Sequence, residues 1–360
     1  MRPSLFSTIL AIGGSQLTSA AALPQEAPSS ITPPALPLSA FEGLSLVTPI
    51  TLEEALAGAD NETETEAPPG LMRLTAAAAT CSNPRVRVEW DSYSDSDRQA
   101  YVDAVKCLMN RGPSGQFAAS RSRYEDLVAL HQTLTPNVHS NANRVNAKFL
   151  IWHRYYLWTF EDMLRSECGF NRAMPWFDET RYAGRFSQSS IFSSRWFGGI
   201  ALGGNCVTDG QFANLAINIG PGSGNSRHCL ARNGDGAKTA NTNQAMVDAC
   251  NNRGGFADMA GCAETGAHAW GHNGIGAVMQ DTYASPADPV FFLHHAFIDR
   301  NWRIWQNRDS ARVNYVDGTD AAGNRLTLDT SVNVYGMRPD VRIRDILDTT
   351  GQTLCYKYNY

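Results

Sequence analysis

Histidine placement limits what this chain can fold into more than any other feature of its sequence. The 360 residues include only eight histidines, and most of these fall into two groups at helical spacing. In the first group, His131 and His153 lie in runs where large apolar residues recur every three or four positions, and His139 lies between the runs. This pattern predicts two amphipathic helices that bury both rings. A single histidine in such a place is usually a hydrogen-bonded core residue, so this group alone does not require a metal.

The second group adds a pair of histidines on a third predicted helix. His268 and His272 are four residues apart within the segment 264–279. Residues four apart on a helix lie on one face, one turn from each other. Two rings placed in this way suit chelation of a single ion.

A fourth predicted helix follows directly. It begins at Asp288-Pro289, an N-cap residue and a first-turn proline, and it carries His294 and His295. His295 and Asp299 are four residues apart. We therefore expect the carboxylate of Asp299 to accept the second ring N–H of His295, as carboxylates behind metal-bound histidines commonly do.

Together the two groups predict a mainly α fold: a four-helix bundle with long loops, whose interior holds six histidines. Burying six imidazoles without partners is costly, and metal sites are commonly built from facing helices of a bundle. Di-iron and di-manganese bundles use Glu-x-x-His motifs, which these helices lack. Two all-imidazole trios favour a pair of copper ions, because copper is at the top of the affinity order for nitrogen ligands. A catalytic zinc held by one trio is the alternative.

The first 80 residues differ in composition from the rest. Residues 1–22 contain a basic residue, a short apolar run and a cluster of small residues, the order typical of a secretory signal, and we predict export with cleavage near Ala22. Residues 23–80 hold eight of the 17 prolines and no cysteine or tryptophan, which predicts a disordered linker or a pro-segment. Within it, 51–57 has the pattern of an isolated helix. Residues 81–360 are expected to form one folded domain.

Charge and cysteine usage limit the partners and the compartment. Residues 81–360 contain 27 acidic and 28 basic residues, so nothing supports a nucleic-acid or lipid-surface role. No apolar run approaches the roughly 18 residues needed to cross a bilayer. All eight cysteines lie in this part and none forms a C-x-x-C pair, which predicts four disulfides in an exported chain. Cys81 and Cys355 bracket the domain and are expected to form one of them.

Two segments resemble the copper-site signatures of tyrosinases, catechol oxidases and molluscan-type hemocyanins. They are Phe149-Leu150-Ile151-Trp152-His153-Arg154 followed by Glu161, and Asp288-Pro289-Val290-Phe291-Phe292-Leu293-His294-His295 followed by Asp299. The resemblance covers most of residues 81–360, and the chain length is similar to that of short secreted fungal polyphenol oxidases. It implies two copper ions, O₂ as co-substrate, and oxidation of o-diphenols to o-quinones, with the metals supplying the redox chemistry.

Matched position by position, the resemblance also implies a ligand set. The first copper would take His131, His139 and His153, and the second His268, His272 and His295. His228 and His294 are then left with structural roles. No cysteine lies between His131 and His139, so the family's Cys–His thioether is expected to be absent.

Four further residues match positions around the family's coppers. Phe291 matches an aromatic residue that stacks on the phenol, with plain core packing as the alternative. Glu264 matches a glutamate that holds a water able to take the phenol proton, and the alternative is a carboxylate that stabilises a helix N-terminus. Ala269 stands where monophenol-hydroxylating relatives often carry Asn, and Asn273 is present to compensate in part.

The resulting hypothesis is a secreted dicopper oxidase that acts on small phenolic substrates, chiefly catechols, with no nucleic-acid or membrane partner. One alternative is a tyrosinase with genuine monophenolase activity. A hemocyanin-like reversible O₂ carrier is another, although a carrier is expected as a large multi-unit chain. A zinc hydrolase is the third.

Overall fold

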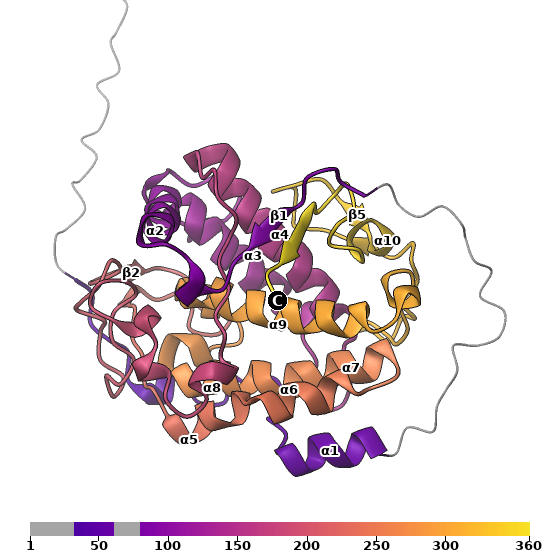
Figure 1. Ribbon diagram of the computed structural model, residues 1–360. Coiled ribbons are helices and arrows are strands. Elements are labelled where there is room, and N and C mark those ends of the chain that lie inside the picture. Colours follow the sequence, from indigo (N-terminus) through magenta and orange to yellow (C-terminus); the bar gives the residue numbers. More distant parts are fainter. Residues whose placement is uncertain (1–31, 61–79) are drawn as a thin grey trace, which may run out of the picture. The chain divides into compact units, whose positions relative to one another are not determined.

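The computed structural model describes residues 32–60 and 80–360 (Figure 1). The predicted signal segment, 1–22, lies outside the described residues. Helices dominate what is described, and the predicted mainly α bundle is confirmed. Its four members are α3 (Arg123–Val138), α4 (Lys148–Cys168), α9 (Val290–Asn307) and a composite helix of three consecutive segments, α7 (Phe256–Ala263), η7 (Glu264–His268) and α8 (Ala269–Ile275).

Local sequence explains where the bundle helices begin and end. Ser122 caps α3, because its side chain accepts the N–H of Glu125. Pro136 lies in the last turn of α3, and the helix stops at Val138. Gly169 ends α4 in the left-handed conformation, with φ of 68°, which a glycine adopts without steric cost. Helix α9 begins at Val290, with Pro289 as its N-cap residue, one position later than the Asp-Pro sequence predicts, and the Asp288 carboxylate accepts the N–H of Val290.

The composite helix is interrupted at its centre. Segment η7 is π-helical, and Gly266 within it has non-helical torsions of φ −86° and ψ −118°. Single-turn π segments occur frequently at functional sites, because the extra residue re-aims the side chains that follow. Here the interruption separates Glu264 at one end of η7 from His268 at the other.

Apart from the 16-residue helix α2, the remaining described elements are short and lie in long connections. The helical ones are η1 (Leu38–Phe41), α1 (Leu52–Asp60), η2 (Trp90–Ser92), α2 (Asp95–Asn110), η3 (Thr180–Tyr182), η4 (Phe186–Gln188), η5 (Ser190–Phe192), α5 (Gly236–Thr239), η6 (Ala240–Thr242), α6 (Gln244–Asn251), η8 (Ala277–Gln280), η9 (Ser285–Ala287), η10 (Ser310–Val313) and α10 (Ile343–Ile346). The strands form three two-stranded sheets: β1 (Arg85–Arg87) with β6 (Tyr356–Tyr358), β2 (Ala216–Ile217) with β3 (His228–Cys229), and β4 (Ser331–Val332) with β5 (Val341–Arg342).

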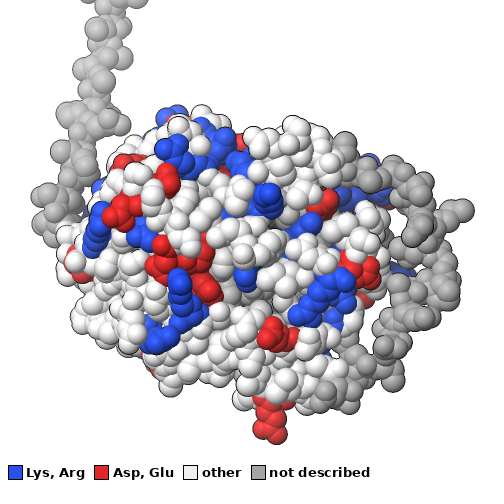
Figure 2. Space-filling model, in the orientation of Figure 1, with Lys and Arg blue, Asp and Glu red and all other residues white. Residues whose placement is uncertain are grey.

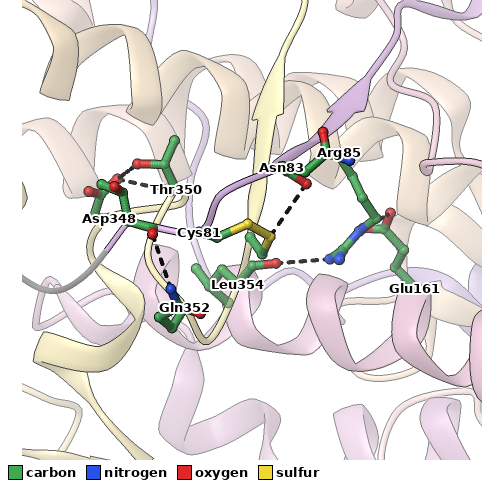
Figure 3. Close-up of a disulfide and its surroundings, with 10 residues drawn as sticks. Cys81, Asn83, Arg85, Glu161, Asp348, Thr350, Gln352 and Leu354 are labelled. Atoms are coloured by element: carbon green, nitrogen blue, oxygen red, sulfur yellow. Dashed lines mark hydrogen bonds and ion pairs between the residues drawn. A yellow bond between two sulfur atoms is a disulfide. The ribbon is translucent and has the colours of Figure 1, made fainter.

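The two ends of the predicted domain are joined. Strands β1 and β6 pair in parallel, with Arg85 opposite Tyr356 and Arg87 opposite Tyr358. Next to this pair, Cys81 and Cys355 form a disulfide, and the Arg85 guanidinium donates to the carbonyl of Leu354 (Figure 3). The prediction of four disulfides, this one included, is confirmed. The other three join Cys107 to Cys168, Cys206 to Cys229 and Cys250 to Cys262.

A buried ionic network ties this sheet to the bundle. Arg87 has no exposed surface and donates from Nε and Nη2 to one carboxylate oxygen of Glu161 on α4, at 3.0 and 2.7 Å. The same guanidinium lies 3.6 Å from Asp299 on α9. Charges removed from water in this way are tolerated because they are paired.

Residues 32–60 pack against the domain. Helix α1 lies beside α6, at the lower edge of Figure 1, and η1 contacts η8. The disordered alternative therefore does not describe this part of the predicted linker, while the pro-segment alternative stays a prediction. The predicted helix over 51–57 is present as α1.

Surface charge shows no single dominant sign. On the face shown in Figure 2, basic and acidic side chains are interspersed over the described surface. Among the described residues, no helix combines the length and the apolar character that a membrane span requires.

Candidate metal centre

The first three predicted histidines meet in the bundle interior. His131 lies on α3, His139 is the residue directly after that helix, and His153 lies on α4. The Nε2 atom of His131 is 3.3 Å from that of His153 and 3.4 Å from that of His139. All three rings are buried.

The second trio forms in the same manner. His268 ends η7, His272 lies on α8, and His295 lies on α9. The Nε2 atoms of His272 and His295 are 3.1 Å apart, and the candidate ligand atoms of this group lie within 4.8 Å of one another. His294 belongs to the same group.

The two trios face each other. The ring of His153 stacks on that of His295, with centroids 4.6 Å apart, and His139 lies over His268 at 6.0 Å. Phe149 fills the space between them, 4.6 Å from the rings of both His153 and His268. Six histidines from distant parts of the chain therefore form one centre with two halves.

Hydrogen bonds behind the rings fix which nitrogen faces inward. Five of the six rings place Nδ1 on an oxygen atom, at 2.7 to 3.1 Å. The partners are Tyr283 O for His131, Glu264 Oε1 for His139, Phe149 O for His153, Glu264 O for His268 and Met279 O for His272. A neutral ring that donates from Nδ1 presents a lone pair at Nε2.

These inward lone pairs are what a metal ion requires. In the first trio, where all three rings place Nδ1 on an oxygen, the Nε2 atoms face one another at 3.3 and 3.4 Å. In the second trio, Nε2 of His272 lies 3.1 Å from that of His295, and Nε2 of His268 has no hydrogen-bond partner among the described residues. Burial lowers the pKa of all six imidazoles, to about 3 for His131, so the rings are neutral donors. A cation at the centre of each trio would replace lone-pair repulsion by coordination. The residues thus fit a two-metal centre with nitrogen ligands.

Glu264 lies behind the first trio. Its carboxylate accepts from Nδ1 of His139 at 3.1 Å, from the Ser140 amide at 2.8 Å and from the Ser140 hydroxyl at 2.5 Å. Burial raises the pKa of Glu264 to about 8, against the lowering effect of both Ser140 hydrogen bonds. The carboxylate is thus placed to orient His139.

A small pocket reaches both trios. Its walls include His139 from the first trio and His268 and His272 from the second, together with Ala269 and Asn273. The other described lining residues are Ser45, Leu46, Val47, Gln280, Thr282 and Ser285. Its internal space of about 20 Å³ is room for about one water molecule.

Phe291 is placed differently from Ala269 and Asn273. It has no exposed surface, stacks on His295 with centroids 4.0 Å apart, and is not among the described residues that line the pocket. This position matches the core-packing alternative.

The prediction that Asp299 accepts a hydrogen bond from the ring of His295 is wrong. Asp299 accepts instead from Arg154 Nε and from the hydroxyls of Tyr356 and Tyr358, each at 2.6 Å. Nδ1 of His295 has no hydrogen-bond partner among the described residues. Helical spacing brought the two side chains to neighbouring turns, but the charge of Arg154 and the two C-terminal hydroxyls occupy the carboxylate.

A buried pair of side chains, which no local sequence pattern predicts, lies beside the second trio. His294 donates from Nδ1 to Glu179 at 2.5 Å, and both side chains have no exposed surface. Gly271 makes room for them, since a Cβ there would lie 2.5 Å from the His294 ring and 2.9 Å from Glu179. Only the adjacency of His294 to His295 hinted at this role. His228 lies apart, on β3 against Phe41.

Comparison with known proteins agrees with this centre. The family described as the common central domain of tyrosinase matches residues 121–308, more than half of the chain. Tyrosinase P of Aspergillus terreus is 30% identical over 345 residues, covering 78% of this chain and 94% of that protein. N-acetyl-6-hydroxytryptophan oxidase ivoB of Emericella nidulans is 30% identical over 343 residues, covering 77% and 92%.

A solved structure supports the fold. A mutant polyphenol oxidase from Thermothelomyces thermophila superposes with a TM-score of 0.69 at 26% identity, covering 77% of this chain and 89% of that one. The family match over residues 121–308 contains all six histidines of the two trios. By sequence, by fold and by the chemistry of its buried histidines, this chain belongs to the tyrosinase family, whose centre is a pair of copper ions with O₂ as co-substrate.

Proposed function

We propose that this protein is a secreted dicopper oxidase that uses O₂ to oxidise o-diphenols to o-quinones. In this proposal His131, His139 and His153 hold one copper, and His268, His272 and His295 hold the other. The observation that carries it is the two facing trios of buried nitrogen donors, in which five of the six rings place Nδ1 on an oxygen and so turn Nε2 inward. Imidazole donors of this kind suit copper.

The chemistry divides between metals and protein. When bound, the coppers supply the redox chemistry with O₂. The reaction balances when two catechols each lose two electrons and two protons and one O₂ is reduced to two waters. The chain's own residues hold the six rings neutral, orient five of them through their Nδ1 partners, and exclude bulk water from the centre.

The position of Glu264 favours catechol oxidation over monophenol hydroxylation. Its carboxylate is occupied by His139 and Ser140 and is not among the described residues that line the pocket. Ala269, in the pocket wall, offers no side-chain donor or acceptor, and Asn273 offers one amide. A monophenol must be deprotonated and hydroxylated before the two-electron oxidation that a catechol undergoes directly, and the pocket wall offers few groups that could assist this extra step. The name of the Emericella relative indicates that hydroxylated aromatic rings other than simple catechols are oxidised within this family.

The experiment combines metal analysis with O₂ uptake. We expect two coppers per chain, and O₂ consumption with 4-tert-butylcatechol that exceeds consumption with tyrosol. His268→Ala should lose copper from the second site and abolish turnover, while His228→Ala, a buried histidine outside the centre, should retain both coppers. Rapid turnover of tyrosol without a lag would favour a tyrosinase with monophenolase activity. Reversible O₂ binding without catechol oxidation would favour a carrier.

A further inference from the structure

Residues 32–60 form a strap that crosses the metal centre before the predicted domain begins. Three sets of contacts hold it. At its start, the Pro34 carbonyl accepts the Cys229 N–H at 3.2 Å, and Phe41 is buried against His228. These contacts attach the strap to the loops around β3.

The middle of the strap is attached to the composite helix that carries His268 and His272. Ile50 donates its N–H to the Thr265 carbonyl at 3.0 Å and accepts from the indole N–H of Trp270 at 2.7 Å. Thr265 and Trp270 flank His268, so this attachment lies directly beside the second trio.

Helix α1 is the third attachment. Ala55 is fully buried, and its carbonyl accepts from Arg253 Nη2 at 2.7 Å. The opposite face of α1 is open, with Leu56 47% exposed. The helix is therefore an addition to the surface near α6 and not a member of the bundle.

Between the first two attachments, the strap forms one wall of the pocket. Ser45, Leu46 and Val47 line the same space as His139 and His272, and Ser45 folds this stretch by donating to the carbonyl of Val47 at 2.8 Å. The remaining space of about 20 Å³ admits a water but not an aromatic ring. The strap thus occupies the side of the metal centre on which this pocket lies, where we expect a phenol to enter.

We propose that residues 44–50 are an autoinhibitory element that closes the phenol-binding side of the metal centre, and that a chain cut after residue 60 releases the strap and activates the protein. This inference rests on the proposed function for its substrate, but the closure itself follows from the contacts alone.

The covalent structure permits such a release. No cysteine precedes Cys81, so no disulfide joins the strap to the domain. Cys81, which follows residues 61–79 in the sequence, is joined to Cys355 by a disulfide that holds the start of the domain (Figure 3). After a cut within 61–79, only non-covalent contacts would retain the strap, while the domain would keep all four disulfides.

The test uses the full chain with a site-specific protease sequence placed within residues 61–79. Two variants are cut and compared with the uncut protein. Ala55→Glu puts a charge into the buried face of α1 and should weaken strap binding, whereas Leu56→Glu changes the exposed face and is the matched control. Both substitutions lie in the strap, so no residue of the domain is changed.

The first readout needs neither copper nor turnover. In copper-free protein, diethylpyrocarbonate should label His139, His268 and His272 slowly before the cut. Labelling should be several-fold faster in cut Ala55→Glu, once its strap fragment has separated on gel filtration. The second readout is kcat/KM for 4-tert-butylcatechol in copper-loaded protein. It should rise at least about tenfold if the strap is closed nine-tenths of the time.

The outcomes separate the two proposals. Faster labelling without catechol oxidation supports the strap and contradicts the proposed function. Departure of the fragment with unchanged labelling and unchanged kcat/KM overturns the strap proposal and leaves the function standing. A fragment that stays bound in cut Ala55→Glu also overturns it, because the proposal requires a strap that can leave.

Discussion

At the scale of single residues, the carboxylate behind His139 is the most informative position. Glu264→Gln keeps the size of the side chain but replaces one carboxyl oxygen, which can accept from His139 or Ser140, by an amide NH₂ group that can only donate. Substitutions of this kind behind a ligand cost about 10- to 100-fold in metal affinity. We expect a loss of that size for the first copper, measured by titrating copper-free protein against a competing chelator. Glu125→Gln, another buried glutamate that accepts backbone N–H groups, is the matched control. Unchanged affinity in Glu264→Gln would show that the carboxylate does not orient the ligand.

A second prediction concerns the glycine under the His294–Glu179 pair. Gly271→Ala would place a methyl group 2.5 Å from the His294 ring, and that buried ring has little freedom to move. Overpacking of this kind costs about 1–3 kcal/mol. We expect the free energy of unfolding in urea to fall by that amount. Gly112→Ala, whose new Cβ meets nothing within 4 Å, should leave it nearly unchanged. Equal stability of the two variants would contradict the close fit around the pair.

At the scale of single residues, the sequence pattern predicted most of the histidines that meet in the centre. Helical spacing placed His131, His153, His268 and His272 correctly, because an amphipathic pattern fixes the direction of each side chain. It failed for Asp299, since the competitors for that carboxylate come from α4 and from the chain's C-terminus. Distant partners leave no periodic signal. Glu179 was missed for the same reason: it lies in a loop, and nothing local connects it with His294.

At the scale of elements, the ionic network that joins β1, β6, α4 and α9 predicts that the stability of the fold decreases in acid. Burial raises the pKa of both Glu161 and Asp299. Their arginine partners, Arg87 for Glu161 and Arg154 for Asp299, outweigh this effect, and further hydrogen bonds add to the lowering. Both pKa values therefore lie below the ordinary 4.5 and 3.8. Groups with lowered pKa values stabilise the fold above the ordinary value and lose that effect as the pH falls. The free energy of unfolding should therefore decrease as the pH falls below about 4.5, measured by urea unfolding at several pH values.

A variant tests whether this network is responsible. Asp299→Asn leaves Arg154 without its charged partner, and breaking a buried pair in this way costs about 3–5 kcal/mol. We expect a loss near that size at pH 7 and a weaker dependence on acid. Asp329→Asn, in an exposed ion pair, should change neither. If the free energy of unfolding of Asp299→Asn depends on acid as strongly as that of the unchanged protein, other carboxylates cause the acid dependence.

The elements themselves were predictable only in part. The four bundle helices follow from periodicity and from signals such as Asp288-Pro289. The π segment η7 does not, because Gly266 breaks no pattern of apolar residues. Nothing local in the sequence marks the close approach of Met246 and Cys250, whose sulfur atoms a Cβ at position 266 would meet at 3.0 and 3.5 Å.

At the scale of the whole molecule, the Cys81–Cys355 disulfide closes almost the entire domain, because its two cysteines are separated by 274 positions in the sequence. A cross-link stabilises mainly by restricting the unfolded chain, more for longer loops, typically by about 2–4 kcal/mol. We expect the paired change Cys81→Ser and Cys355→Ser to lower the free energy of unfolding by that amount. The same change at Cys250 and Cys262, only 12 residues apart, should cost less. The reverse order would contradict loop closure as the cause.

Composition did identify the first 80 residues as different, but it could not show that residues 32–60 lie on the domain. Proline and acidic residues are typical of disordered segments because they bury little apolar surface. Here a few contacts, those of Phe41, Ile50 and Ala55, are enough to seat the segment. Such contacts are specific to the surface beneath and leave no pattern in the segment itself.

The central claim is that six imidazoles hold two copper ions in facing trios. Its most direct test is the metal content of the copper-loaded protein, measured by elemental mass spectrometry together with protein concentration. We predict two copper atoms per chain, a number independent of the strap and of any substrate. One copper per chain, or zinc bound in preference to copper, would contradict the account.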